Sequence, residues 1–263
     1  MKFQINKISQ LVTIKDDISV HQLEESLKAE GFTLGYVPVA DPDITLFDCI
    51  VRRVPNLYFL KYGGLPDLCA GVEWISQSRK LKTLIYPRAA TGPDLRRVFI
   101  GSEELLGKVQ EVTLRIFSRP EKTSWCLVFA DKENTLEELL TKMLAVMLQP
   151  LFVYLGDETE AVELCDGIKI QNDNRPFLAV KLGGLSTVVD LEKTVLSDYL
   201  LRTQLYITHP TSDRENRWLN QHLMMEPRYA AMSKRFPYFW GCDFSPKRIS
   251  SLQFREHFKE NSC

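Results

Sequence analysis

The side chains best able to act as nucleophiles, bases or metal ligands are spread thinly along this chain. The six cysteines form no Cys-x-x-Cys pair and have no close histidine partner: Cys49, Cys69, Cys126, Cys165, Cys242 and Cys263. A zinc or iron–sulfur site needs clustered ligands, so no metal site is expected. The four histidines are also isolated: His21, His209, His222 and His257. Each could be a general base, but a lone histidine is far more often structural or exposed, and no catalytic residue is assigned.

The stretch 86–107 is the densest part of the sequence in turn-forming and short polar residues. Gly101 and Gly107 bracket a short turn or helix, and Pro93 suits the first turn of a short helix. Asp94 and Ser102 could cap turns or bond a ligand, and capping is the common role of both residue types. Elsewhere, the adjacent arginines 52 and 53 suggest an anion contact, although a solvated surface pair is the commoner explanation.

Hydrophobic periodicity places these residues among strands and helices. A strand is predicted over 8–15, and then a helix that begins after Ser19, with Gln22 in a capping box, and ends at Gly31. A buried strand over 67–76 pairs with 82–86 as a hairpin, with residues 78–80 in the turn. A further strand over 109–117 turns Val112, Leu114 and Ile116 to the core.

A second pattern begins after residues 118–122, which form the best domain boundary. Strands are predicted over 125–130, 151–155 and 177–182. Helices are predicted from Thr135 to about 148, over 158–164, and from Thr187 to about 202. This order is ferredoxin-like. The tail from His209 on is aromatic-rich and irregular, with Trp218, Tyr229, Phe236, Tyr238, Phe239 and Trp240.

Composition excludes several classes of protein. Hydrophobic residues make up 44% and charged residues 25% of the 263 residues, which is the usual globular mix. The formal net charge is −1. With no basic excess to neutralise phosphates, nucleic-acid binding is not expected. The apolar runs are far shorter than a membrane helix needs, and the N-terminus lacks the apolar stretch of a secretory signal. We therefore expect a soluble, cytoplasmic protein that contacts no membrane.

Ordered motifs over residues 86–120 resemble the FAD-linked oxidase family, which includes vanillyl-alcohol oxidase and the flavin subunits of glycolate oxidase. Gly92-Pro-Asp-Leu95 is similar to the family's Gly-x-Asp-Leu. Phe99-Ile-Gly-Ser-Glu-Glu-Leu-Leu-Gly107 is similar to Phe-x-Gly-Ser-Glu-Gly-Thr-Leu-Gly. Upstream, Tyr62-Gly63 and Gly71-Val-Glu73 match the family's Tyr-Gly and Gly-Leu-Glu. The specific likeness spans roughly residues 8–120, and 121–205 follow the family by pattern.

The resemblance implies an α+β fold: the second half of a PCMH-type FAD-binding domain (1–119), followed by a ferredoxin-like α/β cap remnant (120–263). It implies FAD as the cofactor, because close backbone approach to a pyrophosphate needs glycines and free N–H groups. The cofactor-binding residues that it implies are Gly92, Asp94, Gly101, Ser102 and Gly107.

Several departures from the family pattern affect the predicted flavin site. No glycine-rich loop precedes Gly31, so the chain is predicted to start after the family's first pyrophosphate-binding subdomain. Where the family has Thr-x-Gly-Gly, this chain has Thr45-Leu-Phe-Asp48, and the second glycine of the later motif is Glu104. The histidine-containing Gly-His-x-Gly-Asp-Gly-Asn-x-His stretch of some members is also missing. The flavin site is therefore expected to be incomplete.

Three functions follow from these observations. The chain could be an FAD-dependent oxidoreductase acting on a small hydroxy acid or alcohol. It could be a flavin-free pseudoenzyme that serves as an interaction module, pairing as a homodimer or with a partner subunit of an oxidoreductase complex, since uncovered sheet edges tend to be covered. A third alternative is a split site, in which another chain supplies the missing loop.

Overall fold

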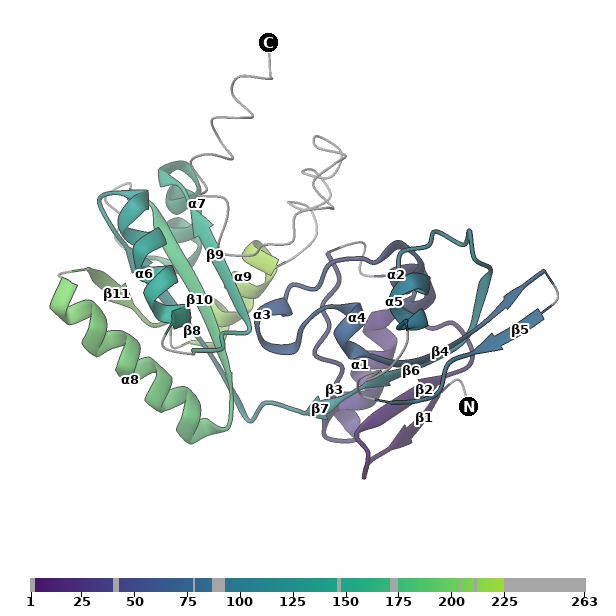
Figure 1. Ribbon diagram of the computed structural model, residues 1–263. Helices are drawn as coiled ribbons and strands as arrows, with labels where there is room; N and C mark the ends of the chain where they lie inside the picture. Colours follow the sequence, from purple (N-terminus) through teal and green to yellow (C-terminus); the bar gives the residue numbers. More distant parts are fainter. Residues whose placement is uncertain are drawn as a thin grey trace, which may run out of the picture.

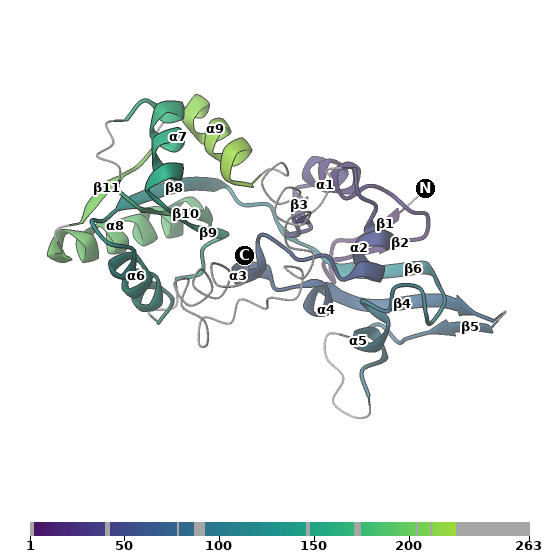
Figure 2. The same ribbon diagram turned by 90° about the horizontal axis from the view of Figure 1, so that it is seen from above.

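The described residues form two main β-sheets, each with its own helices, and a short two-stranded pair (Figure 1). The computed structural model describes residues 3–39, 43–77, 79–86, 93–145, 148–170, 175–203, 205–210 and 212–224. In both views the two sheets lie side by side, with β3, β7 and α3 between them (Figure 2). The fold is therefore mixed α+β, as the sequence predicted.

The first sheet has five antiparallel strands in the order β1-β2-β6-β4-β5. Its strands are β1 (Phe3–Asn6), β2 (Leu11–Ile14), β4 (Cys69–Ser76), β5 (Arg79–Lys82) and β6 (Lys108–Arg115). The short strands β3 (Phe32–Thr33) and β7 (Phe117–Ser118) pair separately. The helices of this half are α1 (Val20–Ala29), α2 (Leu46–Arg52), α3 (Phe59–Tyr62), α4 (Leu65–Leu68) and α5 (Leu95–Phe99).

Local signals explain much of this half. The Ser19 hydroxyl accepts a hydrogen bond from the Gln22 N–H, which caps α1 at the predicted residue. Leu23 and Leu27, one turn apart, are both fully buried. The predicted core residues of β6 and its extension are buried as well: Val112, Leu114 and Ile116.

The second sheet has four antiparallel strands in the order β11-β8-β10-β9. Its elements are β8 (Lys122–Phe129), α6 (Glu133–Ala145), β9 (Phe152–Gly156), α7 (Glu158–Ile168), β10 (Phe177–Gly184), α8 (Ser186–Thr203), β11 (Tyr206–Thr208) and α9 (Asp213–Met224). Counted along the chain, the strands stand in the order 4-1-3-2 of a ferredoxin-like sheet. The ferredoxin-like pattern read from the sequence is therefore confirmed.

Helices cover both faces of this second sheet. Residues of α6 and α8 pack with Cys126, Val128 and Val180 on one face. Residues of α7 and α9 pack with Trp125 and Phe177 on the other. Because both faces are covered, most residues of β8 and β10 are buried whatever their parity along the strand.

The predicted hairpin in the first sheet was misplaced. β5 begins at Arg79, so Arg79 and Lys80 lie in the strand and not in the turn, and 83–86 are not strand. Ion pairs accompany this register: Lys80 and Lys82 of β5 pair with Glu73 of the neighbouring strand β4 at 2.7 and 3.3 Å, and Lys82 also reaches Glu111 of β6, one strand further, at 2.8 Å. Opposite charges on neighbouring strands stabilise such a register.

Three helix starts also differ from the prediction. Thr135 and Thr187 lie inside α6 and α8, which begin at Glu133 and Ser186. Pro93 stands before the N-cap of α5 and not in its first turn. The alternative starts arise because neighbouring polar residues can all cap a helix, and tertiary packing selects one.

The region from His209 on, predicted to be irregular, contains the helix α9. The Ser212 hydroxyl accepts from the Glu215 N–H at 3.2 Å, and the Glu215 carboxylate accepts from the Ser212 N–H at 3.1 Å. This capping box is visible in the sequence and was missed. Leu219 and Leu223 are the fully buried residues of α9. The aromatic residues beyond 224 lie outside the described residues.

A search of the described residues for a membrane-spanning helix found no candidate of sufficient length and apolarity.

Candidate functional site

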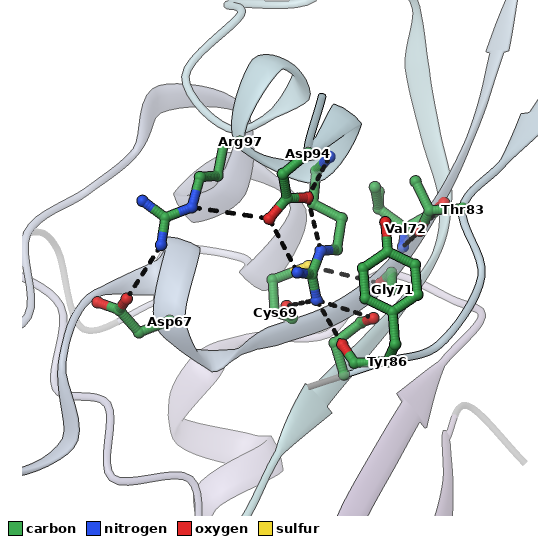
Figure 3. Close-up of polar contacts among 10 residues, drawn as sticks. Asp67, Cys69, Gly71, Val72, Thr83, Tyr86, Asp94 and Arg97 are labelled. Atoms are coloured by element: carbon green, nitrogen blue, oxygen red, sulfur yellow. Dashed lines mark hydrogen bonds and ion pairs between the residues drawn. The ribbon is translucent and has the colours of Figure 1, made fainter. Parts of the chain in front are cut away.

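Asp94, the first of the predicted site residues that the structure describes, caps the short helix α5 (Figure 3). Its carboxylate accepts from the Arg96 backbone N–H at 3.2 Å and forms two charge-assisted hydrogen bonds to the Arg96 guanidinium, each 2.8 Å long. The Arg96 guanidinium holds the pKa of the Asp94 carboxyl below its ordinary value. Both carboxylate oxygens are thus committed to contacts within the protein.

Arg96 itself is a buried residue that the sequence analysis did not single out. Its Nη1 donates to the carbonyls of Cys69, Ala70 and Tyr86 at 3.0, 3.2 and 2.7 Å. Its guanidinium also lies 4.5 Å from the centre of the Tyr86 ring. Figure 3 shows Cys69, Tyr86 and Asp94 close together at this place. Arg96 and Asp94 therefore fasten α5 to the start of β4 and to the chain at Tyr86.

The turn from Gly101 to Gly107, called the 101–107 turn below, follows α5. Gly101 has φ +86° and Gly107 has φ +124°, conformations that side chains disfavour. A Cβ on Gly107 would stand 2.2 Å from the carbonyl oxygen of Ile75, so the backbones approach too closely for any other residue. A Cβ on Gly101 would lie 3.1 Å from the Cβ of Arg53. The fold itself therefore explains why glycine stands at both positions.

Glu103 and Glu104 in the same turn also have positive φ angles, 49° and 64°. Glu104 is the residue that replaces the second glycine of the family motif. This position therefore keeps the left-handed backbone that a glycine would adopt, although a carboxylate side chain now stands there.

Backbone N–H groups of the 101–107 turn are largely used within the protein. Gly101 N–H donates to the Ile50 carbonyl at 3.0 Å, and Glu103 N–H donates to the Val51 carbonyl at 3.0 Å. Both acceptors lie in α2. The turn is thus docked on α2, and these N–H groups are not free to meet a pyrophosphate.

The Ser102 hydroxyl differs from its neighbours. Its Oγ is buried, and among the described residues no hydrogen-bond partner is found for it. A buried hydroxyl without a partner costs roughly 1–3 kcal/mol, so such groups are uncommon and point to a ligand or water. Of the predicted site residues, Ser102 is the one with an uncommitted polar atom, while Gly92 lies outside the described residues.

The segment matching the family's Thr-x-Gly-Gly forms the first turn of α2. Thr45 is the N-cap, and its hydroxyl accepts from the Asp48 N–H at 3.2 Å. The carboxylate of Asp17 accepts from the Phe47 N–H at 3.2 Å. An internal carboxylate and an internal hydroxyl thus occupy N–H groups that an external phosphate would need.

The other candidates from the sequence are explained by the fold. Arg52 and Arg53 are exposed, and Arg53 caps the end of α2.

Burial raises the pKa of the Cys49 thiol to about 12, so this thiol is protonated and unreactive at neutral pH. Among the described residues, no three acidic, histidine or cysteine side chains could jointly hold a metal ion. His209 lies 3.3 Å from the Ser197 hydroxyl, and His222 stacks on Trp218.

Sequence analysis also missed Lys181, a buried lysine in β10. Its Nζ donates to the Tyr58 hydroxyl at 2.8 Å and to the Asn220 amide oxygen at 2.7 Å. Burial lowers its pKa from 10.5 to about 8. A lysine inside an otherwise apolar strand stands out in the sequence at Ala179-Val-Lys-Leu182, which is the signal that could have revealed it.

The arrangement of a five-stranded antiparallel sheet followed by a ferredoxin-like sheet also occurs in a protein of known structure. The structure matches a solved alkyldihydroxyacetonephosphate synthase with a TM-score of 0.69 and 16% sequence identity, covering 84% of this chain and 44% of that one. At this identity the match establishes the fold.

Sequence comparisons lead to the same group of proteins. The chain is 30% identical over 154 residues to alkyldihydroxyacetonephosphate synthase of Caenorhabditis elegans, which covers 58% of this chain and 26% of that protein. It is 25% identical over 153 residues to the FAD-linked oxidoreductase YgcU of Escherichia coli strain K12, which covers 57% of this chain and 32% of that protein. No family model matches the chain. The resemblance to FAD-linked oxidases is confirmed, and the chain spans about a quarter to a third of the length of these curated relatives.

Proposed function

We propose that the chain binds FAD as part of an FAD-linked oxidoreductase and that Ser102 supplies the side-chain contact. The observation that carries this proposal is the buried Ser102 hydroxyl without a partner. This hydroxyl lies in a turn whose backbone course depends on two glycines with positive φ, Gly101 and Gly107. Homology to an FAD-linked oxidoreductase supports the choice of cofactor.

The remaining predicted site residues take supporting roles in this proposal. Asp94 acts through Arg96, since its carboxylate orients the buried guanidinium that anchors α5. Gly101 and Gly107 set the backbone course that presents Ser102. Gly92 is retained from the sequence motif. When bound, FAD would accept the electrons that an oxidoreductase removes from its donor.

This flavin site is incomplete within the chain itself. The N–H groups at the start of α2 are occupied by Asp17 and Thr45, and Glu104 adds a carboxylate near the proposed contact. The isolated chain is therefore expected to show no oxidation of 2-hydroxy acids, because orienting the cofactor and donor accounts for up to roughly 7–11 kcal/mol of a catalysed barrier.

A flavin-free interaction module, acting as a homodimer or with a partner subunit, is the second candidate. The internal use of the Gly101 and Glu103 N–H groups favours it. Large apolar side chains also stand exposed beside this region, with Leu84 79% and Leu105 88% exposed. Such side chains are available to a protein partner.

Titration of the purified protein with FAD, followed by flavin fluorescence and the visible absorption band, separates the two candidates. Saturable binding that Ser102→Ala weakens at least tenfold supports the flavin proposal, and Ser26→Ala on the surface of α1 is the matched control. No binding at millimolar FAD, or equal binding by both variants, refutes it. Gly101→Val is a poorer test, since valine at φ +86° would strain the fold.

A further inference from the structure

Two lysines link the two halves of the structure, one reaching from the first half to the second and the other from the second to the first. Lys61, in α3 of the first half, donates to the Gly183 carbonyl in β10. Lys181, two residues earlier on the same face of β10, donates to the hydroxyl of Tyr58, the residue just before α3. Both views draw α3 between the two sheets (Figures 1 and 2). Lys61 and Lys181 therefore form a reciprocal pair of contacts between one short helix and one strand.

Apolar packing accompanies these two contacts. Leu57 and Tyr58 pack against the core formed by the second sheet with α7 and α9. The Lys181 Nζ also lies 5.3 Å from the Tyr58 ring centre and 5.5 Å from the Trp125 ring centre. The segment Leu57–Tyr62 is thus docked on the second sheet by side chains that come from both halves.

Neither lysine forms an ion pair within the described residues. The groups that face the Lys181 Nζ are all uncharged: the Tyr58 phenol, Asn220 and Met224 of α9, and the Trp125 ring of β8. The charge of Lys181 is therefore withdrawn from water without a direct counter-ion, and that of the half-buried Lys61 is partly withdrawn, which is costly.

The nearest formal charges do little to offset this cost. Lys28 of α1 repels Lys181 and so adds to the effect of burial. Glu192 of α8 attracts Lys61, but its own Oε2 is buried without a hydrogen-bond partner in the described structure. On α1, Glu24 raises the pKa of Tyr58, which is already raised by burial, so this phenol stays protonated.

We propose that α3 and β10 form a latch between the two sheets, closed by Lys61 and Lys181 and poised to open. Closing docks Leu57 and Tyr58 on the second core, while opening returns both ammonium groups to water. The two opposing effects leave the closed state only marginally favoured. The latch gives the second sheet a way to move relative to the first, independently of whether FAD binds.

The latch has a defined dependence on pH. Burial lowers the pKa of Lys181 from 10.5 to about 8 in the closed state, so the closed state binds fewer protons than the open one between these values. The closed state therefore gains stability as pH rises from 8 towards 10.5, by up to about tenfold in the opening equilibrium per pH unit. Burial also lowers the pKa of Lys61, which acts in the same direction.

Hydrogen exchange of the full chain, measured by mass spectrometry with quench flow and corrected for intrinsic rates, tests the latch. Protection of the 57–62 amides should rise several-fold for each pH unit between 8 and 10, relative to peptides from β6. Lys181→Met should weaken this pH dependence and leave the part due to Lys61, whereas Lys122→Met, on the exposed part of the same sheet, should keep it in full. Protection that stays constant with pH in the wild type overturns the proposal, as does an unchanged slope in Lys181→Met.

A second variant covers the case in which Lys181→Met fails to fold. Tyr58→Phe removes the acceptor but keeps the ring, so it should lower protection of 57–62 several-fold at every pH and retain the slope. Equal protection in Tyr58→Phe and the wild type would show that the lysine contact does not hold the latch.

Discussion

Replacing Arg96 by methionine tests whether the Asp94–Arg96 pair is a structural fastening. Methionine fills a similar volume but cannot donate to the carbonyls of Cys69, Ala70 and Tyr86. It also leaves the Asp94 carboxylate without its partner. The Arg96 side chain is 3% exposed and that of Asp94 is 18% exposed, so water can replace few of these bonds.

The expected loss follows from that burial. Removing one partner of a buried ion pair costs about 3–5 kcal/mol. The partial exposure of Asp94 allows its carboxylate to be rehydrated, which places the expected loss near the lower end, about 3 kcal/mol. This is a large fraction of the ~5–15 kcal/mol that stabilises a typical domain.

Urea unfolding followed by tryptophan fluorescence measures the loss. Trp74, one of four tryptophans, stacks on Phe99 of α5 with the ring centres 4.7 Å apart, so its share of the emission responds to the docking of α5. Arg97→Met is the matched control, because the Arg97 side chain is 62% exposed and its contacts to Asp67 and Asp94 are 3.6 and 3.7 Å long. The control should lose less than about 1 kcal/mol. Equal losses in the two variants would refute the structural assignment of Asp94 and Arg96.

Three further predictions concern the same half of the chain. Glu104→Gly should raise the free energy of unfolding by roughly 0.5–1 kcal/mol, because it relieves a left-handed conformation worth about 1–2 kcal/mol and adds backbone entropy to the unfolded chain. Gly107→Ala should lower it by at least about 2 kcal/mol, since the new Cβ meets the Ile75 carbonyl. Acid titration of stability should reveal Asp94: its pKa is lowered in the fold, so its contribution is present above the unfolded value near 3.8 and is lost below it. Urea midpoints measure the first two, and stability between pH 2 and 5 measures the third.

Each of these three predictions has a control variant that isolates the proposed cause. Leu105→Gly removes a side chain in the same turn without relieving a positive φ, so a gain equal to that of Glu104→Gly would contradict the backbone explanation. Gly31→Ala adds a Cβ at φ +82° with nothing within 4 Å, so it should cost less than Gly107→Ala. The acid titration fails as evidence for Asp94 if Asp94→Asn keeps the wild-type loss of stability below pH 3.8.

Signals within a few residues were enough to predict many of the elements. Ser19 caps α1 because its hydroxyl reaches the Gln22 N–H three residues on. Alternation of apolar residues placed β6, and the succession of strands and helices after residue 120 predicted the ferredoxin-like sheet. These features depend on hydrogen bonds and periodicities that a short stretch of chain carries by itself.

Elements whose limits depend on distant partners were predicted less well. The position of β5 goes with contacts of Lys80 and Lys82 with Glu73 on the neighbouring strand β4, and of Lys82 with Glu111 on β6, one strand further. The helix α9 carries its own capping signal, at Ser212 and Glu215. The helix itself is stabilised by burying Leu219 and Leu223 against the second sheet. The sequence does not show which surface will be there to receive them.

The candidate site shows the same division. The motif over residues 92–107 located the turn and the class of protein from sequence alone. Tertiary structure decided which groups in it are free. Arg96 reaches a carbonyl 27 residues earlier, Lys181 reaches a hydroxyl 123 residues earlier, and the N–H of Gly101 reaches α2. Whether a polar group is satisfied depends on the atoms that folding brings within about 3 Å, and sequence spacing does not determine those atoms.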